Sequence, residues 1–159
     1  MSDRVSFKAA VFIIVYDAEG RVLLQRRENT GYMDGYYDFP SGHIELGESM
    51  PTAAVRELAE ETGLTVAEED LRLVHLNQNI IGDYYLNYHF EAVKWKGVPV
   101  IGEPDRCSDV QFFPVDVLPP KCTVSVRDIA RAGFSHDLTY SVVDAQTHQT
   151  LMGEPLAAT

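Results

Sequence analysis

Three glutamates at helical spacing are the residues of this chain whose chemistry is easiest to infer. Glu57, Glu60 and Glu61 stand at positions i, i+3 and i+4, so an α-helix would place their carboxylates on one face. Such like charges cost an isolated helix about 0.2–0.5 kcal/mol per pair, and Arg56 alone cannot neutralise three carboxylates. A solvated charged face is the ordinary explanation of this pattern. A divalent cation is the alternative, because Mg²⁺ takes oxygen ligands, typically one or two carboxylates together with substrate phosphates.

The residues around the glutamates predict the helix that positions them. Ser49 is a favourable N-cap, Pro51 falls in the first turn where a missing N–H is tolerated, and Gly63 supplies a left-handed stop. Glu48, near the start of the helix, would interact with the helix dipole and hydrogen-bond the loop backbone. The opposite face carries the residues expected to meet the core, which are Val55, Leu58, Ala59 and Thr62.

Residues 42–64 extend this pattern to a known motif. They match the Nudix box, G-x5-E-x7-R-E-U-x-E-E-x-G-U with U an aliphatic residue, at Gly42, Glu48, Arg56, Glu57, Leu58, Glu60, Glu61, Gly63 and Leu64. With average residue frequencies, chance would produce such a match on the order of once in a billion starting positions. The chain therefore resembles the Nudix hydrolase superfamily. The resemblance implies an α/β (α+β) fold, with a mixed β-sheet in an α/β/α sandwich and the box as loop, helix and loop.

The resemblance also implies a role for each polar residue of the box. Glu60 and Glu61 would be the principal metal ligands, and Glu57 would be a further ligand or the general base. Arg56 would orient the carboxylates. The backbone carbonyl of Ser41, next to the first glycine of the box, would join the metal shell. The implied cofactor is Mg²⁺, with Mn²⁺ as a substitute.

Residues outside the box are further candidates by the same resemblance. Arg26 would lie near the substrate phosphates, Asp38 and Phe39 would line the base pocket, and Glu103, with Asp105 as second choice, would complete the metal shell or act as base. Ordinary explanations stay open, namely a solvated arginine at a strand end, an aromatic core residue and a solvated acidic loop. Four polar strand residues could also reach a substrate, although the sequence does not say which do: Asn77, Asn79, Asn87 and His89.

Hydrophobic patterns predict the elements around the box. The continuous apolar run over residues 7–16 suits a strand buried on both faces, and residues 21–26 would form its hairpin partner. In residues 84–95 polar and apolar residues alternate, as in a strand with unlike faces. Further strands are expected over residues 36–39, 71–81, 109–113 and 138–145, one helical turn over 115–118 and a helix over 124–134.

Composition narrows the class of protein. A length of 159 residues, 45% hydrophobic and 23% charged, is typical of a single soluble domain, with a core over about residues 5–146 and a loose tail over 147–159. A net charge of −11 argues against binding nucleic acid. No signal peptide or bilayer-spanning run is visible, so we expect a cytoplasmic protein with reduced cysteines and no membrane partner. A homodimer stays open.

The predicted substrate follows from segments of the sequence that resemble particular branches of the family. The segment GEPDRCSDVQFFPVDVLP is similar to MutT-like nucleoside triphosphate pyrophosphohydrolases, whereas no SQPWPFP-like segment of NADH pyrophosphatases follows the box. We expect a small-molecule nucleotide substrate, a (deoxy)nucleoside triphosphate with an oxidised or non-standard purine among the candidates, cleaved to monophosphate and pyrophosphate. The alternatives are hydrolysis of ADP-ribose or another nucleoside diphosphate derivative, and a non-catalytic Nudix domain that senses a nucleotide.

Overall fold

The computed structural model describes residues 3–153, and residues 1–2 and 154–159 lie outside this description. A five-stranded sheet contains, in spatial order, β4 (Ser41–His43), β1 (Lys8–Ile14), β6 (Tyr85–Ala92), β5 (Leu71–Asn79) and β8 (Thr139–Val143). A three-stranded sheet contains β3 (Tyr37–Asp38), β2 (Val22–Arg27) and β7 (Cys107–Phe113). The helices are α1 (Met50–Thr62), α2 (Val124–Arg131) and α3 (Ala145–Gly153).

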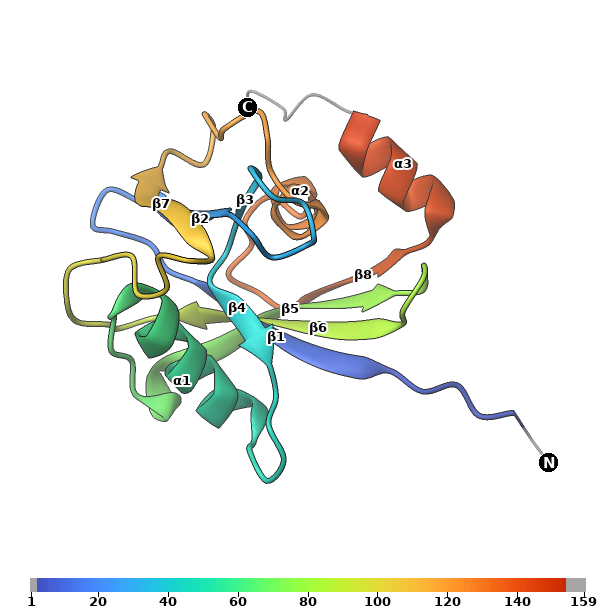
Figure 1. The fold of residues 1–159 in the computed structure, drawn as a ribbon, viewed down its shortest axis with the longest axis horizontal. Coiled ribbons are helices and arrows are strands. Elements are labelled where there is room, and N and C mark those ends of the chain that lie inside the picture. The colour runs from blue at the N-terminus through green and yellow to red at the C-terminus, as the bar shows by residue number, and fades with distance from the viewer. Residues whose placement is uncertain (1–2, 154–159) are drawn as a thin grey trace.

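Helices cover both faces of the large sheet. Figure 1 shows α1 on one face and α2 and α3 on the other. The sheet is mixed, because β1 runs parallel to β6 and β5 parallel to β8, while the β1–β4 and β5–β6 pairs are antiparallel. The predicted mixed sheet within an α/β/α sandwich is therefore confirmed. None of the helices within residues 3–153 is long and apolar enough to cross a lipid bilayer.

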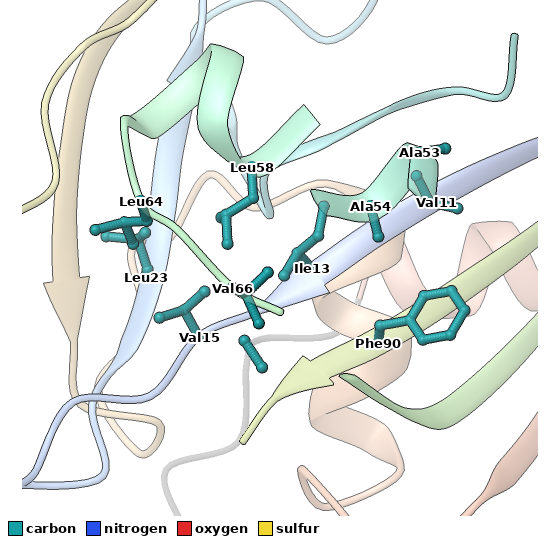
Figure 2. Packing of buried hydrophobic residues seen from close by; sticks show 11 residues of the cluster. Val11, Ile13, Val15, Leu23, Ala53, Ala54, Leu58, Leu64, Val66 and Phe90 are labelled. Atoms are coloured by element: carbon teal, nitrogen blue, oxygen red, sulfur yellow. The ribbon is translucent and has the colours of Figure 1, made fainter. Parts of the chain in front are cut away.

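The helix that carries the three glutamates has the predicted ends. Ser49 Oγ accepts a hydrogen bond from Thr52 N at 3.2 Å, and Gly63 ends the helix at φ 73°, where a residue without Cβ is favoured. Figure 2 shows Leu58 directed toward the core cluster that contains Ile13. The buried face consists of Ala53, Ala54, Leu58 and Thr62, whereas Ala59, expected there, is exposed.

The prediction that residues 7–16 and 21–26 pair as a hairpin is wrong, except next to the turn that connects them. Strand β1 is buried as predicted, but its partners are β4 and β6. Strand β2 belongs to the other sheet and pairs with β3 and β7. The two strands meet only near the turn, at an isolated bridge between Tyr16 and Val22. Both are buried on both faces, and an apolar run of this kind does not specify its hydrogen-bonding partner.

Strand β6 has the unlike faces that its alternation predicts. Tyr88 and Phe90 pack in the cluster under α1. On the other face, Asn87 donates a hydrogen bond to Asn77 of β5 at 3.0 Å, and His89 Nε2 lies 2.7 Å from the hydroxyl of Ser125 in α2. At β6, one face of the large sheet thus meets an apolar core and the other carries polar side chains. On that second face, Ile14 and Val74 belong to another apolar cluster, which includes residues of α2.

The C-terminal third departs from the predicted elements. Residues 115–118 form a hydrogen-bonded turn, with Val117 N donating to Pro114 O at 3.0 Å, instead of a helical turn. Helix α2 ends before residue 134 because Gly133 and Phe134 have φ of 73° and 48°, outside the right-handed helical region.

The expected loose tail is wrong for residues 147–153, which belong to α3. Asp144 caps this helix by accepting a hydrogen bond from Thr147 N at 2.8 Å, and Leu151 is buried at 3% exposure. A single buried leucine in a short helix gives little periodicity to detect. The rest of the expected tail, residues 154–159, lies outside the described residues.

Acid should destabilise the protein through His89. Burial is the main cause that lowers the pKa of His89 to about 3, against about 6.5 in an unfolded chain. Between pH 6.5 and 3 the unfolded state therefore binds the extra proton, so stability falls as the pH falls, by about 1.4 kcal/mol per unit. Urea unfolding at pH 4, 5 and 7 measures this slope, which should be shallower in His89→Gln. If the stability of the two proteins depended equally on pH, the attribution of this slope to His89 would be contradicted.

Candidate active site

The three glutamates of α1 line a cavity of about 350 Å³, which we call the acidic cavity. Its other walls come from β2, from β4 and from the loop before β7, so segments far apart in the sequence meet there. All the predicted metal ligands line it, namely Ser41, Glu57, Glu60, Glu61 and Glu103, and so does Arg56. Asp105, the second choice, is not among the lining residues.

Arg56 donates hydrogen bonds to three carboxylates of the box. Its guanidinium binds Glu48 through two hydrogen bonds of 2.7 and 2.8 Å, and these contacts are the main reason that the pKa of Glu48 falls to about 2. The same guanidinium donates to Glu57 at 2.8 Å, to Glu60 at 3.3 Å and to the His43 carbonyl at 3.0 Å. Arg56 therefore connects Glu48, near the start of the box, with the candidate ligands Glu57 and Glu60.

Glu61 lies deeper in the acidic cavity than Glu60. Its Oε2 accepts hydrogen bonds from Ser41 N, at 2.9 Å, and from the amide of Gln25. Loss of hydration is the largest cause that raises the pKa of Glu61 to about 8, and it also raises the pKa of Glu57. The side chain of Glu60 is 48% exposed. Within residues 3–153, Glu61 thus has no ion-pair partner, whereas Glu57 is paired with Arg56.

The donor chemistry of the acidic cavity fits a hard divalent cation. Carboxylate oxygens and the Ser41 carbonyl are the ligand types that Mg²⁺ prefers, and Mg²⁺ usually keeps several waters. A cation would also offset the unfavourable ionisation of Glu57 and Glu61. Within residues 3–153, no three His, Cys, Asp or Glu side chains are already arranged to hold a metal ion.

Two glycines set the spacing around the glutamates. A Cβ on Gly42 would lie 2.0 Å from the carboxyl carbon of Glu57, and one on Gly102 would lie 2.0 Å from the backbone oxygen of Glu60. Gly102 N also donates to the Glu61 carbonyl at 2.9 Å. Gly102 thereby attaches the following loop to the end of α1, which places Glu103 beside the box.

Arg27, not Arg26, points into the site. Adjacent residues of a strand face opposite sides, and the phase of β2 directs Gln25 and Arg27 into the acidic cavity. Arg26 is exposed and lines neither of the two cavities described here. Arg27 is held by hydrogen bonds to Tyr32 O at 2.7 Å and to the Thr30 hydroxyl at 3.0 Å. The place in the site that was expected of Arg26 is therefore occupied by its neighbour Arg27.

A second cavity, of about 560 Å³, adjoins the acidic cavity, and we call it the polar cavity. Residues of both cavities include Arg27, Ser41, Gly42, His43 and Arg106. Asp38 lines the polar cavity as expected; it is 4% exposed, and burial raises its pKa to about 6. Phe39 is fully buried, lies edge-on to His89 in the core and lines neither cavity. Phe39 is thus a core residue.

Amides form the floor of the polar cavity. Asn77, Asn79 and Asn87 line it, whereas His89 does not. Asn77 Nδ2 donates to Asp128 at 3.1 Å, and Asn77 Oδ1 accepts from Asn87 at 3.0 Å. Because a carboxylate only accepts, this chain of bonds fixes the orientation of both amides.

Sequence reasoning missed seven lining residues of the acidic cavity: Gln25, Arg27, Thr30, His43, Glu45, Arg106 and Cys107. None lies at a fixed position of the box. The one available signal was the period of two along β2, which groups Gln25 with Arg27 once the phase of the strand is known.

One domain family matches most of the chain. The NUDIX domain model matches residues 6–132. An NAD-capped RNA hydrolase of Pseudomonas aeruginosa is 33% identical over 119 residues, which cover 75% of this chain and 40% of that protein. An 8-oxo-dGTP diphosphatase of Escherichia coli is 29% identical over 110 residues, which cover 67% of this chain and 84% of that protein. The chain thus spans less than half of the first relative.

Solved structures show the same fold. The MutT NUDIX hydrolase from Burkholderia pseudomallei superposes with a TM-score of 0.71 at 24% sequence identity, covering 78% of this chain and 95% of that one. At this identity the likeness concerns the fold alone.

Proposed function

Because the chain belongs to the Nudix family, we propose that it is a divalent-cation-dependent pyrophosphohydrolase. The proposed substrate is a (deoxy)nucleoside triphosphate, cleaved with water to the nucleoside monophosphate and pyrophosphate. The observation that carries this proposal is the acidic cavity, where carboxylates that suit a cation and arginines that suit phosphate line the same space. The adjoining polar cavity supplies room for the nucleoside.

The glutamates would hold the cation and the attacking water. Mg²⁺, or Mn²⁺ in its place, would be bound by Glu57, Glu60, Glu61 and the Ser41 carbonyl, with Glu103 as an additional ligand. When bound, the cation would neutralise charge on the phosphate oxygens and lower the pKa of a water. Glu57 or Glu61, both of which line the acidic cavity, would accept the proton from this water.

The remaining residues would orient the nucleotide. Arg27 and Arg106 lie where the two cavities meet, so they are placed to bind phosphate oxygens between the metal and the nucleoside. Asn87, whose orientation is fixed by its hydrogen bond to Asn77, offers its amide group to the base. The name of the Pseudomonas relative makes a capped RNA end the alternative substrate. A net charge of −11 favours the free nucleotide.

A hydrolysis panel with Mg²⁺ tests the proposal. It compares canonical and oxidised nucleoside triphosphates with ADP-ribose, dinucleoside polyphosphates and NAD-capped RNA, and measures pyrophosphate and monophosphate separately. We expect pyrophosphate release from one triphosphate well above the others. Turnover of ADP-ribose or capped RNA alone would move the assignment to that substrate, and no turnover across the panel would favour a nucleotide sensor.

Substitution of the two neighbouring arginines should separate the phosphate contact from general surface charge. Arg27→Ala should raise KM about 10-fold to 100-fold, the value of a lost charged hydrogen bond of about 1.5–3 kcal/mol. Arg26→Ala is the matched control and should stay within about twofold of the wild type, since exposed side chains contribute little. Steady-state kinetics on the preferred substrate measures both. A larger effect for Arg26 would restore the sequence-based assignment.

A further inference from the structure

The side chain of Gln25 connects β2 to the deepest glutamate of the acidic cavity. It lines this cavity, although only 8% of the residue is exposed. Gln25 Nε2 donates a hydrogen bond to Glu61 Oε2. Gln25 Oε1 is buried and has no hydrogen-bond partner among residues 3–153. The amide is therefore half satisfied, because its NH₂ group has a partner and its oxygen has none within these residues.

The chemistry of the pair fixes the direction of this amide. A carboxylate oxygen is an acceptor, so the amide must turn its NH₂ group toward Glu61 and its carbonyl oxygen away. Ser41 N donates to the same oxygen of Glu61, Oε2, at 2.9 Å. Because both donors bind Oε2, the other oxygen of Glu61 is the one left to face the cavity. Gln25 thus selects which carboxylate oxygen is presented.

The unpartnered oxygen of Gln25 shows that the placement of this side chain has a cost. A buried acceptor without a hydrogen bond is costly and rare in folded proteins. The hydrogen bond from Nε2 to Glu61 is present despite this cost, and it holds Glu61 among the candidate metal ligands that line the acidic cavity. This step depends on the cation site of the proposed function.

We propose that Gln25 is a positioning residue that fixes Glu61 for the metal through the hydrogen bond from Nε2 to Glu61 Oε2. Partners of ligating carboxylates typically contribute 10-fold to 100-fold in metal affinity or activity. The residue acts through Glu61, without touching the phosphate itself.

A neighbouring glutamine provides a matched control. Gln111 lies on β7, the strand beside β2, opposite Leu24. It also donates to a carboxylate, Asp109 Oδ2, at 2.6 Å, but it is exposed and lines neither cavity. Gln25→Met and Gln111→Met therefore make the same chemical change inside and outside the acidic cavity.

Mn²⁺ binding without substrate, measured by calorimetry, tests the positioning role separately from turnover. Gln25→Met should weaken Mn²⁺ binding about 10-fold to 100-fold and should lower kcat more than it changes KM, while Gln111→Met matches the wild type. Wild-type Mn²⁺ affinity in folded Gln25→Met would overturn the proposal.

Two further results distinguish failure of this inference from failure of the proposed function. If Gln25→Met does not fold, Gln25→Asn keeps the amide but is one methylene shorter; it should show the same weakened Mn²⁺ binding, and normal binding would again overturn the proposal. A wild-type protein that hydrolyses nothing and binds no Mn²⁺ would reject the proposed function together with this inference. An active wild type with an unaffected Gln25→Met would reject the inference alone.

Discussion

Replacing Glu61 with glutamine is expected to lower kcat by about two to four orders of magnitude, the typical contribution of a group that moves a proton. Glu61 is the carboxylate held by both Ser41 N and Gln25, and loss of hydration raises its pKa to about 8. Glutamine has nearly the same shape and can still accept the hydrogen bond from Ser41 N. It cannot act as an anionic ligand or accept the proton. Steady-state kinetics and thermal unfolding together measure the two effects.

Glu68→Gln is the control for this experiment. Glu68 is exposed, hydrogen-bonds Thr52 at 2.8 Å and lines neither cavity, so its replacement should leave kcat within about twofold. Glu60→Gln should also remove most activity if the implied ligand role is correct. Near-normal turnover in Glu61→Gln would exclude Glu61 from the chemistry.

Gly102→Ala should produce the largest loss of stability. The new Cβ would lie 2.0 Å from the backbone oxygen of Glu60 and 3.0 Å from the carbonyl carbon of Glu61. A helix backbone cannot move aside as a flexible side chain can, so overpacking should cost about 1–3 kcal/mol or more. At about 2–4 °C per kcal/mol for a domain of this size, Tm should fall by several degrees. Activity should also fall because Glu103 follows this loop.

Gly153→Ala is the control that tests whether any replacement of a glycine by alanine lowers the melting temperature. No atom lies within 4 Å of a Cβ built on Gly153, at the end of α3, so alanine there should be neutral or slightly stabilising. Differential scanning calorimetry of both variants measures the difference. Equal melting temperatures for Gly102→Ala and the wild type would mean that the loop does not pack on α1 as described.

The helix and its acidic face were predictable because each depends on local chemistry. Ser49 and Gly63 mark the ends of α1 by capping rules that need no tertiary information. The spacing of the glutamates puts them on one face wherever the helix packs. The box also accounts for Gly42, whose missing Cβ leaves room for Glu57.

The predictions failed where a side chain's position depends on which face of a strand it occupies, or on a partner that is distant in the sequence. Arg26 and Arg27 are adjacent and chemically alike, so only the phase of β2 in its sheet determines which one faces the site. That phase depends on pairing with both β3 and β7, and β7 lies about eighty residues later in the sequence. Phe39 is similar, since its position before the box suits a pocket wall or a core equally well. Nothing in the local sequence identified Gln25, because its role depends on contact with Glu61, which lies far away in the sequence.

³¹P NMR of the products tests the central claim most directly. The wild-type protein is incubated with the triphosphate that the panel identifies, with Mg²⁺ or with EDTA. We predict resonances of nucleoside monophosphate and pyrophosphate with Mg²⁺ and unchanged triphosphate with EDTA. Nucleoside diphosphate with orthophosphate, or equal turnover in EDTA, would contradict a cation-dependent pyrophosphohydrolase.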